Sequence, residues 1–327
     1  MKRTLGAIAA GVMALSMATA AQAETRVTLK SAKAASSYYQ MAAQFAEAMK
    51  TGTNGDVIVT VEESQGSVQN VMEAMVRPGN YVFTSPPGLV SLAQAAKGPF
   101  KDRPAEKFAG VRALFPIPSL TMHFVMRADS GATDFAGLEG KTILLGKGSF
   151  GAKEGEKYLG LFGLDGKVNL ADAELSNAVA ALKNGQIDGF VTAGSWPAPN
   201  VIEAAAGTDV NVLSLSDEQL ALTKRDKTVI PAGTYNGQDK DITTASLSVV
   251  AFATTQMDDD TAYQLTKTFW EEKARMGAES PWWTGVDPAL LQKYVPKDIR
   301  VLLPEYPTDD LETDIRRLGY ENIVYPR

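Results

Sequence analysis

The chain of 327 residues contains no cysteine and a single histidine, His123. The absence of cysteine excludes a disulfide framework, so the fold has to be held by burial of apolar side chains, which a chain of this length can supply. Cysteine and histidine are also the ligands that zinc, copper and iron prefer, so we expect no metal site of this kind. We expect no cofactor, and the length favours two domains.

The chain also lacks a hydrophobic run long enough to span a bilayer. The apolar residues 5–18 fall short of the roughly 20 residues that a transmembrane helix needs. They follow Lys2 and Arg3 and precede Ala21-Gln22-Ala23, a pattern typical of a secretory signal peptide cleaved before Glu24. Because Glu24 is not a cysteine, we expect no lipid anchor there. The sequence therefore predicts a signal peptide over residues 1–23 and a soluble periplasmic protein.

Neither sign of charge dominates any part of the chain. The formal net charge is -6, from 32 basic and 38 acidic residues, and loss of Lys2 and Arg3 leaves 30 against 38, or -8. Because both signs are scattered, we do not expect nucleic acid or an anionic membrane surface as a partner. The run Asp258, Asp259 and Asp260 precedes a helical pattern, which favours a helix start over a calcium site.

What the sequence does contain is a repeated unit of strand, short polar loop and helix. The unit occurs over residues 27–50, 57–77, 81–96, 142–161 and 187–206. At each helix start, unpaired backbone N–H groups and the positive end of the helix dipole suit the capture of a small anion. Strands separated by helices favour a parallel, doubly wound sheet, with the binding crevice beyond the carboxyl ends of the strands.

Two extended runs, residues 111–115 and 121–127, are separated by Pro116 and Pro118, and a third covers residues 244–253. We interpret these runs as two crossings between two lobes. Lobe I is predicted over residues 24–118 and 245–327, and lobe II over residues 119–244. Each lobe is expected to be a mainly parallel sheet flanked by helices, with the ligand in the cleft between them and capture by hinge closure.

The candidate ligand-binding residues stand where strands end and helices begin. Those of lobe I are Ser36, Ser37, Tyr38, Gly66, Ser67, Asn70, Thr84 and Ser85, and those of lobe II are Lys147, Ser149 and Trp196. The serines can donate hydrogen bonds to an anion, and helix capping is the alternative role for them. Lys147 precedes Ser149, so the loop does not match a nucleotide phosphate loop, and a solvated turn is its alternative. Tyr38 and Trp196 can form pocket walls, or Trp196 can pack between lobes.

Enzymatic activity is not expected. A nucleophilic triad would need His123 beside a serine and an aspartate, but His123 lies in an apolar alternation, residues 122–126, away from any glycine-rich elbow. This pattern favours a buried structural histidine. An exported hydrolase and a soluble receptor subunit of a membrane sensor remain as alternatives.

Three segments resemble the TAXI family, the solute-binding subunits of tripartite ATP-independent periplasmic (TRAP) transporters. They are residues 126–131 (MRADSG) leading to 138–141 (LEGK), residues 182–189 (LKNGQIDG), and residues 230–239 (IPAGTYNGQD). The resemblance implies a two-lobed periplasmic binding protein of type II that delivers its ligand to a TRAP membrane permease. It also implies a small anionic solute, namely a dicarboxylate, an oxoacid or an amino acid such as glutamate.

Overall fold

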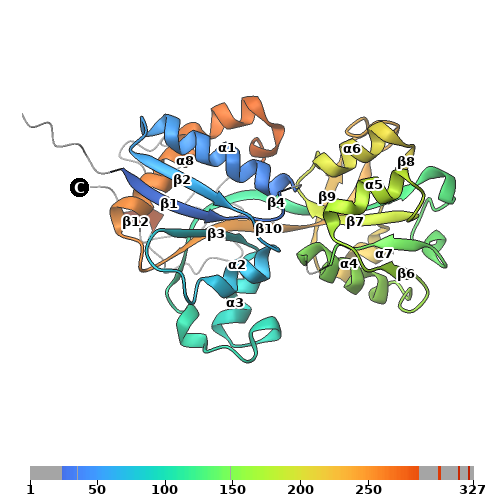
Figure 1. Ribbon diagram of the computed structural model, residues 1–327, viewed down its shortest axis with the longest axis horizontal. Coiled ribbons are helices and arrows are strands. Elements are labelled where there is room, and N and C mark those ends of the chain that lie inside the picture. The colour runs from blue at the N-terminus through green and yellow to red at the C-terminus, as the bar shows by residue number, and fades with distance from the viewer. Residues whose placement is uncertain are drawn as a thin grey trace, which may run out of the picture.

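The computed structural model describes residues 24–34, 36–147, 149–286, 301–302, 316 and 323–324. Two lobes lie along the long axis and are joined by two long strands (Figure 1). In the described residues, one ten-stranded sheet runs through both lobes in the order β2-β1-β3-β10-β4-β7-β5-β6, with β8 beside β4 and β9 beside β10. The predicted two-lobed α/β fold is therefore confirmed.

Lobe I is built from three strand–helix units. They comprise β1 (Thr25–Lys30), α1 (Ser37–Gly52), β2 (Val57–Glu62), α2 (Ser67–Glu73), β3 (Tyr81–Ser85) and α3 (Pro87–Gln94), followed by 3₁₀ turns at Gly98–Phe100 and Ala105–Phe108. Strand β1 pairs in parallel with β2 and β3. Helices α1 and α8 (Asp259–Glu279) cover one face of the sheet, and α2 and α3 cover the other (Figure 1). A 3₁₀ turn at Pro281–Trp283 follows α8, and short strands β11 (Val301–Leu302) and β12 (Ile323–Val324) form a separate parallel pair.

Apolar side chains at helical and strand spacing fill the core of lobe I. Phe115 stacks on Phe269 with ring centroids 4.1 Å apart, and Phe45 contacts both rings. Asp258 caps helix α8: its carboxylate accepts the N–H of Thr261 at 2.7 Å. The acidic run is therefore a helix start, as predicted, because a carboxylate satisfies an unpaired donor there.

Lobe II repeats the arrangement with shorter strands. It comprises 3₁₀ turns at Ala128–Ser130 and Ala136–Leu138, β5 (Thr142–Leu144), α4 (Phe150–Leu161), β6 (Asn169–Ala171), a 3₁₀ turn at Leu175–Asn177, α5 (Ala178–Lys183), β7 (Gly189–Gly194), α6 (Pro199–Gly207), β8 (Val210–Val212), α7 (Asp217–Thr223) and β9 (Asp226–Ile230). Strand β5 pairs in parallel with β6 and β7. All five predicted strand–helix units are present, as β1–α1, β2–α2, β3–α3, β5–α4 and β7–α6.

The two crossings are the antiparallel strands β4 (Val111–Arg127) and β10 (Ile242–Thr254). The predicted break at Pro116 and Pro118 is wrong, because β4 is a single strand of 17 residues. Strand β7 pairs with β4 only from Thr121 onward, so both prolines have a strand neighbour on one side alone, where a missing N–H is tolerated. The predicted lobe boundaries, after residues 118 and 244, fall inside these strands and stay a prediction.

No helix in the described part of the chain is both long and apolar enough to cross a membrane. The predicted signal peptide, residues 1–23, lies outside the described residues.

Candidate functional site

A cavity lies between the lobes, where the carboxyl ends of the parallel strands of both lobes meet. About 540 Å³ of space that no atom fills lies there, including the part that opens to solvent. The lining comes from both lobes and both crossing strands: Ser31, Ala32, Lys33, Ser36, Tyr38, Gln65, Gly66, Ser67, Thr84, Leu120, Ser149, Phe150, Gly151, Leu175, Ala193 and Val249. The predicted site residues Ser36, Tyr38, Gly66, Ser67, Thr84 and Ser149 are among them.

The start of α1 forms one wall. Ser36 caps the helix: its hydroxyl accepts the Tyr39 N–H at 3.3 Å and donates to the carbonyl oxygen of Lys33 at 2.6 Å. The next two backbone N–H groups, of Ser37 and Tyr38, have no partner within the described residues. The Tyr38 hydroxyl donates to the Pro118 carbonyl oxygen at 2.7 Å, and burial raises its pKa. Tyr38 therefore offers its ring and its backbone N–H to the cavity.

The loop before α2 brings the lobes together. Gly66 has φ +110°, and a Cβ placed there would lie 3.8 Å from the backbone nitrogen of Phe150 in lobe II. Gly66 is also the residue at the cap position of α2, so the alternative role of helix cap does not hold for Ser67. As the first helical residue, Ser67 keeps a hydroxyl that forms no hydrogen bond with any described residue.

Thr84 at the end of β3 supplies a second unused hydroxyl. Its side chain is 7% exposed, lines the cavity and forms no hydrogen bond with the part of the chain that the structure describes. The backbone of Thr84 is held by Asn70, whose amide Nδ2 donates to the carbonyl oxygens of Ser31 at 2.7 Å and Thr84 at 2.9 Å. Asn70 thus ties the ends of β1 and β3 together from a buried position behind the cavity.

The start of α4 forms the opposite wall, in lobe II. The Ser149 hydroxyl accepts the Ala152 N–H at 3.0 Å, and the N–H groups of Phe150 and Gly151 have no partner among the described residues. A Cβ at Gly151 would lie 3.0 Å from the Ala193 Cβ and 3.2 Å from its nitrogen. The glycine therefore allows α4 to begin directly against β7, which places its first turn at the cavity.

The other sequence candidates lie outside the lining. The Ser37 hydroxyl accepts the Ser195 N–H at 3.1 Å, a contact between lobes. Ser85 is fully buried and its hydroxyl donates to the Pro86 carbonyl oxygen. Lys147 is ion-paired with Asp172 at 2.9 Å, with its side chain 62% exposed. Trp196 packs against the core of lobe II.

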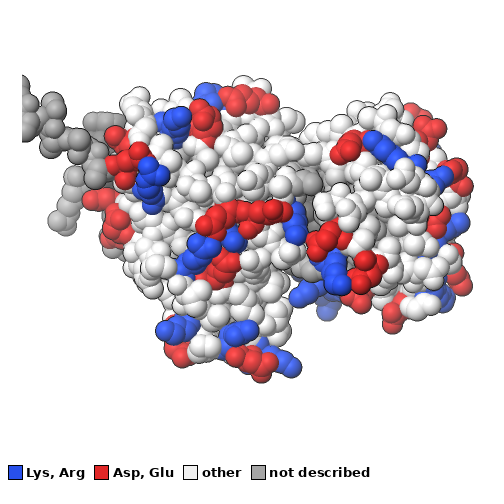
Figure 2. Space-filling view, viewed as in Figure 1, with Lys and Arg blue, Asp and Glu red and all other residues white. Residues whose placement is uncertain are grey.

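One charged side chain, Lys33, lines the cavity. Its Nζ lies 3.3 Å from Oε2 of Glu174, so this ion pair joins the loop after β1 to the loop after β6 across the two lobes. Basic and acidic side chains elsewhere are intermixed over both lobes on the face shown in Figure 2. No group of His, Asp or Glu side chains that could hold a metal ion is found in the described residues.

His123 is fully buried on β4 and does not line the cavity. Its Nδ1 lies 3.1 Å from the Thr121 carbonyl oxygen and its Nε2 lies 2.8 Å from the Tyr235 hydroxyl. The carbonyl can only accept, so Nδ1 carries the proton and Nε2 accepts from Tyr235. Burial disfavours the charged ring and lowers the pKa of His123 to about 4. The predicted buried, structural histidine is confirmed in position.

Sequence reasoning missed the apolar part of the lining. Leu120 and Val249 come from the crossing strands, and Leu175 and Ala193 come from lobe II. Ser31 and Lys33 carried a usable signal, because they directly follow the carboxyl end of β1.

The two lobes, the two crossing strands and the cavity between the lobes define the periplasmic binding protein fold. Solved structures agree: the periplasmic binding protein BugD is similar with a TM-score of 0.54 at 12% identity, covering 91% of this chain and 99% of BugD. MatC from Rhodopseudomonas palustris, solved with bound malate, gives a TM-score of 0.55 at 12% identity, covering 90% of this chain and 97% of MatC. The chain belongs to the NMT1-like family, which it matches over residues 29–290.

Proposed function

We propose that the protein is an extracytoplasmic solute-binding protein that captures a small carboxylate between its lobes and delivers it to a TRAP-type membrane permease. The observation that carries this proposal is the meeting of two helix starts, α1 and α4, at one cavity. Each helix brings a serine cap and two backbone N–H groups that have no partner within the described residues. Donors of this kind, backed by helix dipoles, favour an anion.

Three side chains add to the donor set. The hydroxyls of Ser67 and Thr84 are unused by the described residues, and Lys33 supplies positive charge to the lining. A carboxylate offers about four acceptor sites on two oxygens, so it can accept hydrogen bonds from both walls at once. The malate bound by MatC shows that this fold can hold a carboxylate, which supports the proposal.

Closure of the lobes would enclose the solute. Contacts between the lobes in the described residues include Ser195 N–H to Ser37 Oγ, the Lys33–Glu174 pair, and Trp282 Nε1–H to the Pro197 carbonyl oxygen at 2.9 Å. We propose that these contacts form on closing and that β4 and β10 bend near residues 118 and 244. The resemblance to the TAXI family supports the permease partner and a periplasmic location.

The exported-hydrolase alternative is less well supported. Its base would be the sole histidine, but His123 is enclosed between Thr121 and Tyr235. Hydrolysis of esters or amides that disappears in His123→Ala would favour this alternative instead.

The proposal is tested by a thermal-shift screen of carboxylates, followed by calorimetric titration of the hits, because a ligand of the native state raises apparent stability. Ser67→Ala and Ser149→Ala should each weaken binding by roughly tenfold or more, since a hydrogen bond to a charged group contributes about 1.5–3 kcal/mol. Ser91→Ala, on the exposed surface of α3, is the control and should bind normally. Unchanged affinity in both cavity variants would contradict the site.

Delivery needs a separate test. Vesicles containing the permease should take up the solute only when the binding protein is present. Tight binding without uptake would favour the sensor alternative.

A further inference from the structure

We infer that the solute is a monocarboxylate with an apolar body, and that the cavity selects against dicarboxylates. This inference rests on the proposed function and narrows the substrate class of the same cavity. It follows from an uneven distribution of donors, charges and apolar groups over the lining.

The cavity provides positive charge for one carboxylate. Among the described residues of the lining, Lys33 is the one that carries a charge, and Glu174 already lies 3.3 Å from its Nζ. The nearby Lys30 is 7% exposed and its Nζ is directed at Glu62 and Glu73, at 3.2 and 3.4 Å. No arginine lines the cavity within the described residues. The lining therefore binds an anion mainly through neutral donors and helix dipoles.

Those donors come from strand and helix ends. The first turns of α1 and α4 contribute N–H groups, and Thr84 at the end of β3, 7% exposed, contributes a hydroxyl that no described residue uses. Together with Ser67 they are enough to satisfy all the acceptor sites, about four, of a single carboxylate.

Most of the remaining lining is apolar; its polar members are Gln65 and Ser31, and the Ser31 hydroxyl already donates to the Tyr38 carbonyl oxygen at 2.8 Å. Leu120 and Val249 come from the crossing strands, and Phe150, Leu175 and Ala193 come from lobe II. An apolar chain placed against these side chains is removed from water, which favours binding. A second carboxylate in the same place would lose its hydration without gaining a partner, which is strongly unfavourable.

The experiment compares acids of one carbon skeleton that differ only in the far end. Three matched pairs are titrated calorimetrically into the mature protein at neutral pH: pentanoate and glutarate, 2-oxopentanoate and 2-oxoglutarate, norvaline and glutamate. In every pair that binds, the methyl-ended acid should bind tighter by roughly tenfold or more. Equal or tighter binding of the dicarboxylates overturns the inference and leaves the proposed function standing. Binding of none of the six acids, nor of any other small carboxylate, would overturn both.

Two variants with matched controls test whether the apolar chain of the solute lies beside Leu175 and its carboxylate beside Lys33. Leu175→Ala should weaken binding of 2-oxopentanoate by about tenfold but leave pyruvate, which lacks the chain, within about twofold. Leu170→Ala removes a leucine that is 48% exposed on the neighbouring β6 and should change neither. Loss of pyruvate binding in Leu175→Ala, or equal loss in both leucine variants, contradicts the apolar subsite.

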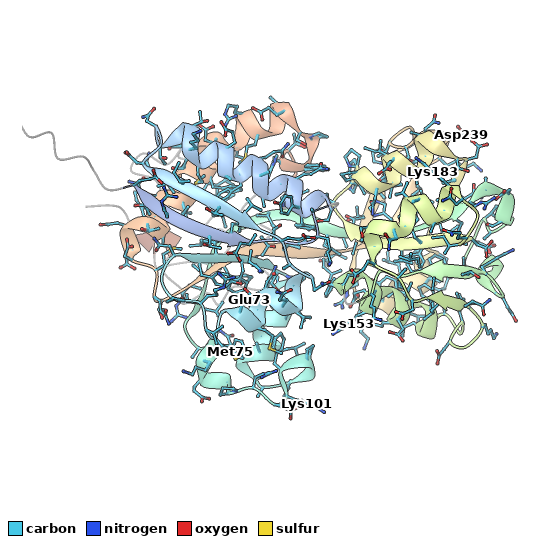
Figure 3. The ribbon with its side chains drawn as sticks, in the orientation of Figure 1. Glu73, Met75, Lys101, Lys153, Lys183 and Asp239 are labelled. Atoms are coloured by element: carbon cyan, nitrogen blue, oxygen red, sulfur yellow. The ribbon has the colours of Figure 1, made fainter. Side chains whose placement is uncertain are left out.

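Lys33→Gln should weaken all the monocarboxylates by a similar factor, because it acts on the shared carboxylate. Lys101→Gln makes the same charge change at the lower end of lobe I (Figure 3), outside the lining, and should have no effect. If the loss of affinity in Lys33→Gln grew with the length of the solute's apolar chain, Lys33 would lie beside that chain and not beside the carboxylate, and the assignment would be overturned.

Discussion

Acidification should destabilise the protein through His123, and the chain offers an unusually clean test because it has no other histidine. Burial lowers the pKa of His123 to about 4 from an ordinary value of 6.5. In the unfolded chain the ring binds a proton below the ordinary value, whereas in the folded protein it stays neutral until the pH approaches 4. The unfolded state therefore binds more protons over this window, and the free energy of unfolding falls as the pH decreases.

The size of the effect follows from the two pKa values. The whole shift corresponds to about 3 kcal/mol, since one pKa unit is about 1.4 kcal/mol. Between about pH 8 and pH 5 the loss is about 2 kcal/mol, because at pH 5 the unfolded ring is almost fully protonated and the folded ring is almost fully neutral. Only about 0.2 kcal/mol of this loss is expected above pH 7.

The measurement is urea unfolding followed by tryptophan fluorescence at a series of pH values, in the wild type and in His123→Gln. The glutamine is uncharged throughout, so it removes the histidine titration. Carboxylates such as Glu62 and Asp258, whose pKa is lowered by hydrogen bonding, also lose stabilisation in acid, but they do so in both proteins. The wild type should therefore lose about 2 kcal/mol more than the variant on going from pH 8 to pH 5. Parallel pH profiles, or a histidine NMR signal that titrates near pH 6.5 in the folded protein, would refute the reasoning.

Three further predictions concern residues that build the site or its supports. Gly66→Ala should lower the free energy of unfolding by roughly 1–3 kcal/mol because alanine is strained at φ +110°, as chemical denaturation would show; Gly88→Ala, in α3 with no atom near its Cβ, is the control. Asn70→Ala should lower the free energy of unfolding by roughly 2–3 kcal/mol and weaken solute binding, because the carbonyl groups of Ser31 and Thr84 lose their donor. Unchanged affinity in this variant would show that Asn70 stabilises the fold without supporting the site. Arg225→Met should lower the free energy of unfolding by roughly 2–3 kcal/mol, because Glu154, which is 7% exposed, loses the guanidinium that lies 2.7 Å from it. A variant as stable as the wild type would show that water replaces the guanidinium.

The strand–helix units could be predicted from sequence because each ends in a local signal. The turn Asn54-Gly55 follows α1, Pro87 opens α3, and Ser36 and Ser149 cap their helices. Helix α7 is not among the predicted helices, although Ser216 and Gln219 form a capping box that marks its start in the sequence. Strand β9 carries no such signal: it is a polar strand, Asp226–Ile230, that pairs with β10, and tertiary contact decides its conformation.

Some residues of the candidate site could likewise be predicted from the sequence, and others could not. Thr84 lies at the end of β3, and Ser36 and Ser149 cap the helices that follow β1 and β5, so the rule that binding residues gather at carboxyl ends of parallel strands locates them. Leu120 and Leu175 could not be found in this way, because they line the cavity only once two lobes meet. Ser37 shows the opposite error: a serine beside the site is used by the backbone of Ser195 instead.

The crossing strands β4 and β10 contain an irregularity beside the cavity. Between Leu247 and Val249 the partner in β4 changes from Leu120 to Ile117, so β4 contains one more residue than β10 at this point. Such an irregularity leaves backbone groups without ladder partners and redirects side chains. The carbonyl oxygens concerned are taken up by hydroxyls from opposite lobes: Tyr38 donates to Pro118, and Ser195 donates to Ser119 at 2.8 Å. The irregularity lies at the predicted lobe boundary and beside Leu120 in the cavity. Bending of β4 there would move Leu120 in the cavity together with the hydrogen bond between Ser195 and Ser119. We expect solute binding and closure of the lobes to be coupled in this way.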